Sequence, residues 1–239
     1  MKVAIHQPHY LPWLGYLAKW AEADLFIFLD TVQYEKNGWQ NRNQIKTKEG
    51  PRWLTVPVRG RLGVSIAEVE IDTTQAWARR HLVAIEHAYA RAPHFKRYAP
   101  ELGDFYARAW TRLAPLAAAS ARWLAGAVGI ATPARLASEL GVTTRDPSRR
   151  LVELGRAVGA TVYLAGRDGP QYMDLPQFAA AGIEVRVQQY VHPVYPQPHG
   201  EFVPFLSALD LLLMHGDAAL AILRHGNQWT RLGPEPRGA

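Results

Sequence analysis

The chain has 239 residues, 48% of them hydrophobic and 20% charged, which is typical of a globular protein with a full core. It contains no cysteine, which excludes disulfides, thiolate metal sites and cysteine nucleophiles. The net charge is +6, and the basic residues are scattered along the chain. This distribution argues against a nucleic-acid partner and leaves anionic small molecules as candidate substrates.

The chain begins with a strand, loop, helix and strand, a pattern typical of α/β folds. Apolar residues at 2–5 predict a buried strand, and residues 25–29 predict a second strand that ends at Asp30. A right-handed crossover through a helix at 15–23 would place both strand ends on the same edge of a parallel sheet. The first apolar run is too short for a signal peptide or a membrane span, so we expect a cytoplasmic protein without a membrane partner.

The remaining chain predicts a helical segment between two α/β halves. We expect residues 1–74 and 131–230 to form one domain, with an inserted α-helical lobe at 75–130 and a flexible tail at 231–239. The predicted fold class is therefore α/β, with a mostly parallel sheet and flanking helices. Further strands are predicted at 53–58, 65–71, 135–138, 161–165 and 183–189, and further helices at 77–91, 100–113, 114–128, 146–158, 176–181 and 202–214.

Polar and aromatic side chains follow the first strand directly. In α/β folds, ligands bind where a strand ends and the next helix begins, because free backbone N–H groups lie there. Two prolines restrict the backbone of this loop, so it should hold its side chains in place. The alternative is an ordinary polar turn. The candidate site residues here are His6, Gln7, His9, Tyr10 and Trp13.

The stretch 30–46 is dense in hydrogen-bonding side chains. Asp30 at a strand end is a candidate general base, and Arg42 is a candidate clamp for phosphate or carboxylate that neighbouring amides would hold in place. A plain surface loop is the alternative interpretation. The candidate substrate-binding residues of this stretch are Gln33, Lys36, Trp39, Asn41, Arg42 and Lys46.

Two later stretches resemble the opening loop in composition. Gly166 follows a predicted strand and permits close approach of a ligand to the backbone. A second stretch, at 190–200, mixes histidine, tyrosine and proline. Ordinary turns have similar compositions, so both interpretations stay open. The candidate substrate-binding residues here are Gly166, Tyr172, Tyr190, His192 and Tyr195.

The nine histidines do not predict a metal site. Two from the opening loop and two from the later stretch lack the spacing of a zinc motif, so we expect no bound metal. Surface positions are expected for the three histidines of the helical segment, His81, His87 and His94.

Five stretches of this sequence resemble the WbqC-like protein family. They are HQPHYLPWLGY at 6–16, DTVQYEKNGWQNRNQIK at 30–46, WLTVPV at 53–58, SRRLVELGRAVGATVYLAG at 148–166 and YVHPVYPQPHGEFVPFLSALDLLL at 190–213. The family is known from gene clusters for O-antigen and other surface-sugar assembly, where one member is assigned as a glycine transferase. The resemblance therefore implies a transferase that moves an acyl or aminoacyl group to an amino sugar or related amine.

The family's motif positions extend the candidate site. A departure from the family pattern is Met214-His215-Gly216, where an Asn before the Gly is expected. The motif positions fall on His6, Gln7, Tyr10, Pro12, Trp13, Asp30, Gln33, Lys36, Trp39, Asn41, Arg42, Arg150, Gly166, Tyr172, Tyr190, Tyr195 and Pro196.

Three functions remain as hypotheses. In the first, His6 or Asp30 takes a proton from the acceptor amine, while Arg42 and Lys36 hold a nucleotide-sugar or carrier-linked acyl donor. In the second, suggested by a fold-level likeness of the opening to nucleotidylyltransferase-like folds, His6 and Lys46 bind the phosphates of ATP with Mg²⁺. That family's second histidine is absent at residues 13–15. In the third, the protein binds a nucleotide-sugar or carrier without turnover.

Overall fold

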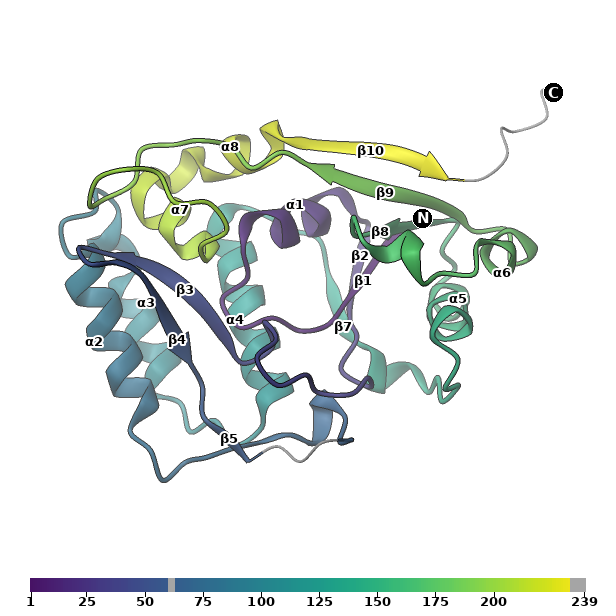
Figure 1. Cartoon of the computed structure of the whole chain (residues 1–239), viewed down its shortest axis with the longest axis horizontal. Coiled ribbons are helices and arrows are strands. Elements are labelled where there is room, and N and C mark those ends of the chain that lie inside the picture. Colours follow the sequence, from purple (N-terminus) through teal and green to yellow (C-terminus); the bar gives the residue numbers. More distant parts are fainter. Residues whose placement is uncertain (60–62, 233–239) are drawn as a thin grey trace.

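The computed structural model describes residues 1–59 and 63–232, and its centre is a six-stranded sheet (Figure 1). The strand order is β10-β9-β8-β1-β2-β7. All neighbouring pairs are parallel except β10 with β9, so the predicted α/β class with a mainly parallel sheet is confirmed. The strands are β1 (Lys2–His6), β2 (Leu25–Phe28), β7 (Ala134–Leu136), β8 (Val162–Ala165), β9 (Glu184–Tyr190) and β10 (Asn227–Leu232).

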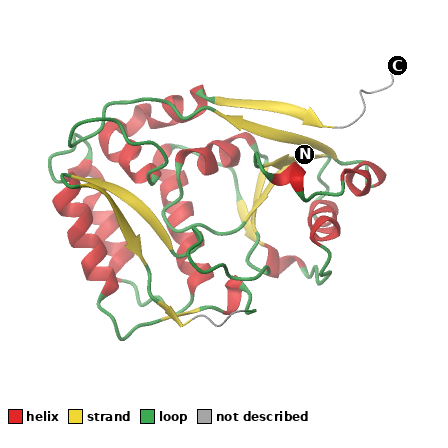
Figure 2. Cartoon of the chain, viewed as in Figure 1, coloured by secondary structure: helices red, strands yellow, loops and turns green. Residues whose placement is uncertain are grey.

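Helices cover both faces of the sheet (Figure 2). Successive strand residues point to opposite faces, so Ala4 belongs to one core cluster while Val3 and Ile5 belong to the other. The first cluster includes residues of α1 (Leu14–Glu22), α4 (Leu113–Val128), α7 (Ala208–His215) and α8 (Ala219–His225). The second includes residues of α5 (Pro147–Ala157) and α6 (Leu175–Ala180).

Among the described residues, the segment between β2 and β7 contains three α-helices, one 3₁₀ turn and two small two-stranded antiparallel sheets. The helix predicted at 100–113 is α3, which begins at Phe95 and contains Pro100. Burial of Tyr98, Leu102 and Phe105 along one side continues across the proline and offsets the missing backbone hydrogen bond. The elements are β3 (Arg42–Thr47), β4 (Gly50–Thr55), β5 (Val58–Arg59), β6 (Glu70–Ile71), α2 (Trp77–Tyr89), α3 (Phe95–Ala107) and α4.

Several elements of the structure were not predicted or begin at a different residue. Strand β3 was missed because its buried face contains a polar residue, Asn43, beside Ile45. The predicted helix at 202–214 begins only at Ala208, after the N-cap Ser207. Four 3₁₀ turns were also missed: Ile66–Glu68, Ala137–Leu140, Gly169–Gln171 and Gly216–Ala218.

The C-terminal end of the described chain differs from the predicted flexible tail. Helix α8 and strand β10 were not predicted, and β10 pairs with β9 from Asn227 to Leu232. Arg231 and Leu232 therefore belong to the sheet. The rest of the predicted tail, residues 233–239, lies outside the described residues.

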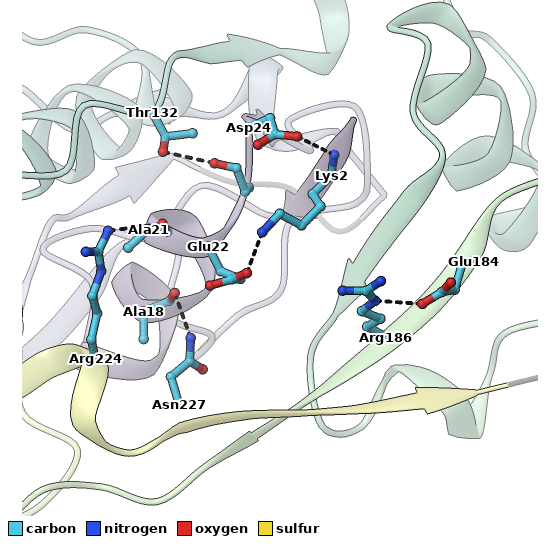
Figure 3. A network of polar contacts seen from close by, with 11 residues as sticks. Lys2, Ala18, Ala21, Glu22, Asp24, Thr132, Glu184, Arg186, Arg224 and Asn227 are labelled. Carbon is cyan, nitrogen blue, oxygen red and sulfur yellow. Dashed lines mark hydrogen bonds and ion pairs between the residues drawn. The ribbon is translucent and has the colours of Figure 1, made fainter.

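Polar contacts fix the C-terminal half of α1 (Figure 3). Asn227 Nδ2 donates to the carbonyl oxygen of Ala18 at 3.1 Å, and Lys2 Nζ lies 2.5 Å from Glu22 Oε1. Thr132 Oγ1 donates to the carbonyl oxygen of the C-cap residue at 3.0 Å. Helix α1 is thus held by β1, by β10 and by the segment before β7. None of the described helices combines the length and apolarity needed to cross a lipid bilayer.

Candidate functional site

The sheet has a topological switch point between β1 and β8. The chain leaves β1 through α1 toward β2 on one side, and leaves β8 through α6 toward β9 on the other. In open α/β sheets, ligands bind beside the C-terminal ends of the two strands at such a point, because the connections diverge there. His6 ends β1, and Gly166 follows β8.

Three aromatic rings contact one another at the end of β1. The centroids of His6 and His9 are 4.7 Å apart in an edge-on arrangement, and His9 stacks on Tyr16 of α1 at 5.0 Å. The Tyr16 hydroxyl donates to the carbonyl oxygen of Gln7 at 3.1 Å. These contacts lock the loop that carries the histidines onto the start of α1. We call His6, His9, Tyr16, Lys19 and Gly166 the switch-point cluster.

Lys19 lies one helical turn after Tyr16 and is only 2% exposed. Within residues 1–59 and 63–232, its Nζ has no hydrogen-bond acceptor and no carboxylate in salt-bridge range. A β-carbon on Gly166 would stand 3.7 Å from this Nζ, so the amine points at the end of β8. Burial lowers the pKa of Lys19 to about 7. Both the ammonium and the amine are therefore populated near neutral pH.

The two histidines are neutral near pH 7. Burial, followed by the charge of Lys19, lowers the pKa of His9 to about 3. Burial, Lys19 and then His9 also lower the pKa of His6, although the contact of His6 Nδ1 with the carbonyl oxygen of Gln7 at 3.2 Å opposes this. Neutral imidazoles can accept a proton or donate an N–H, so the cluster can both bind an anion and move a proton.

The histidine loop is attached to the segment that precedes β3. Gln40 Nε2 donates to Gln7 Oε1 at 2.7 Å, and the backbone N–H of Tyr10 donates to the carbonyl oxygen of Trp39 at 3.2 Å. Leu11 has a φ of 44°, an unusual backbone conformation for a non-glycine residue. Two parts of the predicted site, the opening loop and the stretch 30–46, thus lie side by side.

Asp30 lies on the same sheet edge as His6, as predicted. The strands pair in parallel, and the backbone N–H of Leu29 donates to the carbonyl oxygen of His6 at 2.8 Å. However, the Asp30 carboxylate accepts hydrogen bonds from the backbone and the hydroxyl of Ser138. Its contacts are with the turn after β7 and not with the switch-point cluster.

Arg42 is held differently from the prediction. Its Nη1 donates to Asn37 Oδ1 at 3.3 Å and its Nη2 donates to the carbonyl oxygen of the same residue. Its guanidinium also lies 4.3 Å from the ring centroid of Trp53. The expectation that the amides of Gln40, Asn41 and Asn43 hold Arg42 is wrong. These three amides donate instead to Gln7 Oε1 and to the carbonyl oxygens of Val56 and Leu11, respectively.

Two predicted site residues are buried structural groups. Lys46 Nζ donates to the carbonyl oxygens of Gly200, at 3.1 Å, and of Glu201. The Tyr10 hydroxyl lies 2.9 Å from His81 Nδ1 and also contacts the hydroxyl of Tyr106. The predicted surface position of His81 is therefore wrong. It is 5% exposed, and burial lowers its pKa to about 4.

The remaining predicted residues do not contact the switch-point cluster in the part of the chain that the structure describes. Trp13 packs edge-on against Tyr190 at 5.6 Å, and His192 lies beside the buried Tyr195. Arg150, on the other face of the sheet, donates to two backbone carbonyls. Gln33, Lys36, Trp39 and Tyr172 are exposed.

A cavity of about 560 Å³ lies away from all of these residues. It is bordered by α6 and by the first residues of β9, at the sheet edge opposite His6. Its lining includes Phe178, Ile183 and Arg231, none of which was a candidate. In the part of the chain that the structure describes, no three histidine or acidic side chains are grouped to hold a metal ion.

Tyr16 and Lys19 were not among the predicted site residues. The sequence contains a signal for Lys19, because it is a lysine on the helix side that also carries Tyr16 and other buried residues. It is also one of five lysines in the first fifty residues, in a chain that otherwise prefers arginine.

Comparisons with known proteins agree on the family. The sequence model of the WbqC-like protein family matches residues 7–222. The chain is 38% identical, over 232 residues, to the uncharacterized protein Rv1507c of Mycobacterium tuberculosis, covering 95% of this chain and 99% of that protein. No solved structure matches the chain.

Proposed function

Because this chain belongs to the WbqC-like protein family, and because basic groups without acidic partners meet at its switch point, we propose that it is a group-transfer enzyme whose substrates bind there. One observation carries the proposal. The rings of His6 and His9 contact each other at the end of β1, the Lys19 amine points at the end of the adjacent β8 and its charge lowers the pKa of both rings, and no described carboxylate pairs with these groups. An anionic group on a substrate would supply the missing partner.

The anionic group would be a phosphate or carboxylate of the donor. Lys19 is half protonated near pH 7, and an anion at the switch point would favour its charged form. The neutral ring of His9 would add a hydrogen bond to the same oxygens, while the Nε2 of His6, whose Nδ1 faces the carbonyl oxygen of Gln7, stays free to accept a proton. A nucleotide-sugar or a carrier-linked acyl donor has such a phosphate.

In the transfer step, the nitrogen of an acceptor amine attacks the acyl carbonyl carbon of the donor. The N–C bond forms, the bond to the leaving group breaks, and the amine's proton passes to His6. The Lys19 ammonium stabilises the negative charge that develops on oxygen. The acyl group would be glycine-like and the acceptor an amino sugar or related amine, as the family suggests.

A binding experiment tests the location of the site. Calorimetric titrations with pyrophosphate, ATP with Mg²⁺, UDP-amino sugars and dTDP-amino sugars would compare the natural chain with Lys19→Met and His6→Gln. We expect at least tenfold weaker binding in both variants. His87→Gln is the matched control, because His87 is exposed on α2. Binding that is unchanged in Lys19→Met and His6→Gln would overturn the proposal.

A turnover experiment separates the three hypotheses. A new amide detected by mass spectrometry supports acyl transfer, and pyrophosphate release from ATP supports nucleotidylyl transfer. Binding of an amino-sugar nucleotide without any product, across a panel of acyl donors, would favour a binding protein and contradict the enzymatic role.

A further inference from the structure

Two lysines of this chain are equally buried but have different surroundings. Lys19 and Lys46 are each 2% exposed. The ammonium of Lys46 donates to the carbonyl oxygens of Gly200 and Glu201, which stabilise its charge. Across the described residues, Lys19 Nζ has no acceptor. Burial without a partner favours the neutral form of an amine, so Lys19 is the lysine with a free electron pair at neutral pH.

The Lys19 amine is not fully enclosed. Some described side-chain nitrogens are fully enclosed by protein and have no hydrogen-bond partner. His9 Nδ1 is one of them, and Lys19 Nζ is not. Gly166 leaves space beside the amine, because a β-carbon there would stand 3.7 Å from Nζ. A small molecule at the ends of β1 and β8 would therefore reach this nitrogen.

From these features we propose that Lys19 is a nucleophile that forms a reversible imine with a small aldehyde or 2-oxo acid. Nζ attacks the carbonyl carbon to give a carbinolamine, and the C–O bond then breaks as the C=N bond forms. The two amine hydrogens leave with the carbonyl oxygen as water. His6 can move the proton that this dehydration requires, because its ring is neutral with Nε2 free to accept, and it is near enough for the charge of Lys19 to act on it.

A 2-oxo acid fits the cluster better than an uncharged aldehyde. The carboxylate next to its carbonyl group would accept a hydrogen bond from the ring of His9, which has no acidic partner in residues 1–59 and 63–232, while the N–H of the neutral His6 ring faces the carbonyl oxygen of Gln7. This inference shares the location of the proposed function. It requires neither transfer of an acyl group nor binding of a phosphate.

Reductive trapping tests the imine. The full chain is incubated at pH 7 with glyoxylate and cyanoborohydride, and peptides are mapped by mass spectrometry for a carboxymethyl group on lysine. We expect Lys19 to be labelled at least tenfold faster than the exposed Lys36 and Lys48, and Lys46 to stay unlabelled. Labelling of Lys19 no faster than that of the exposed lysines would overturn the proposal.

Two variants sharpen the test. Gly166→Val should slow labelling of Lys19 at least tenfold by filling the space beside Nζ, with an unchanged circular dichroism spectrum. Lys19→Arg keeps the positive charge but cannot form an imine, so it should lose the label and still bind pyrophosphate. If the natural chain is labelled rapidly at Lys19 but does not bind pyrophosphate, the proposed function is contradicted and the imine proposal still holds. Fast labelling that persists in Gly166→Val would contradict the proposed approach to the amine.

Discussion

Asp30 accepts two hydrogen bonds from Ser138, one from the backbone N–H at 3.0 Å and one from the hydroxyl at 2.7 Å. The pair connects the chain after β2 with the turn after β7, although the two residues are 108 positions apart. Hydrogen bonds to a buried carboxylate replace those that it would make to water. Asp30 therefore supports the sheet edge on which His6 lies.

Removing this pair of hydrogen bonds should reduce the stability of the protein more than its affinity for a ligand. We expect Ser138→Ala to reduce the free energy of unfolding by about 1–3 kcal/mol, since a hydrogen bond to a charged group is lost. Urea denaturation gives the stability, and calorimetry with pyrophosphate gives the affinity. An Asp30→Asn variant with normal stability but no ligand binding would instead support a catalytic role for Asp30.

Lys19 should destabilise the folded protein at neutral pH. Burial lowers its pKa from 10.5 to about 7, so between these values the unfolded chain holds a proton that the folded chain lacks. Stability should therefore rise from pH 7 toward pH 10, by at most about 1.4 kcal/mol per pH unit. We expect Lys19→Met to be more stable at pH 7 and to lack this rise in urea denaturation.

Lys46→Met is the matched comparison for Lys19→Met. It removes hydrogen bonds to Gly200 and Glu201 and should lower stability. Equal effects of the two substitutions would contradict the different surroundings described for the two lysines.

Acid should destabilise the protein through two buried histidines. The pKa of His9 falls to about 3 and that of His81 to about 4, so the unfolded chain binds protons first as the pH drops below 6.5. The stability contributed by these histidines is complete above pH 6.5 and declines as the pH falls, down to about pH 4 for His81 and about pH 3 for His9. Each histidine contributes at most about 1.4 kcal/mol per pH unit to the slope.

Variants can assign that acid slope. We expect His9→Gln and His81→Gln each to make urea stability less dependent on pH between 6.5 and 4. The exposed His87→Gln serves as the control. A slope unchanged in both buried-site variants would show that other groups cause the acid sensitivity.

Arg42→Lys tests the anion clamp predicted from the sequence. The guanidinium contacts Trp53 and Asn37, so we expect the lysine variant to lose about 1 kcal/mol of stability and to bind pyrophosphate normally. Urea denaturation and calorimetry measure the two effects. A tenfold loss of affinity for pyrophosphate in Arg42→Lys would instead support the predicted role of Arg42 in anion binding.

Sequence patterns predicted the sheet well where strands are apolar. The runs that became β1, β2 and β8 contribute apolar residues to the cores on both faces, so composition identifies them, and β9 is identified by the alternation of Val185 and Val187 with polar residues. Strand β3 was missed because Asn43 is buried by hydrogen bonding to the opening loop, a contact 32 residues away. Local composition cannot reveal a partner at that distance.

The site was predictable in part for the same reason. His6, Gln7 and His9 form a local pattern after a strand, and Gly166 was found at the end of another. Lys19 gives no local sign that it lacks a partner, because that depends on how α1 packs against β8. Asp30 was predicted as a general base from its place at a strand end, and the sequence gives no sign of the contact between its carboxylate and Ser138.

Strand β1 pairs with a neighbour on each side; His6 ends β1, His9 lies in the loop that follows it, and Lys19 lies on the next helix, α1. Opening this segment would remove an interior strand from the sheet, which is the most cooperative part of such a fold. Ligand binding and tertiary structure should therefore disappear in one transition as urea rises. We therefore expect no partly unfolded form that retains the sheet but has lost the site.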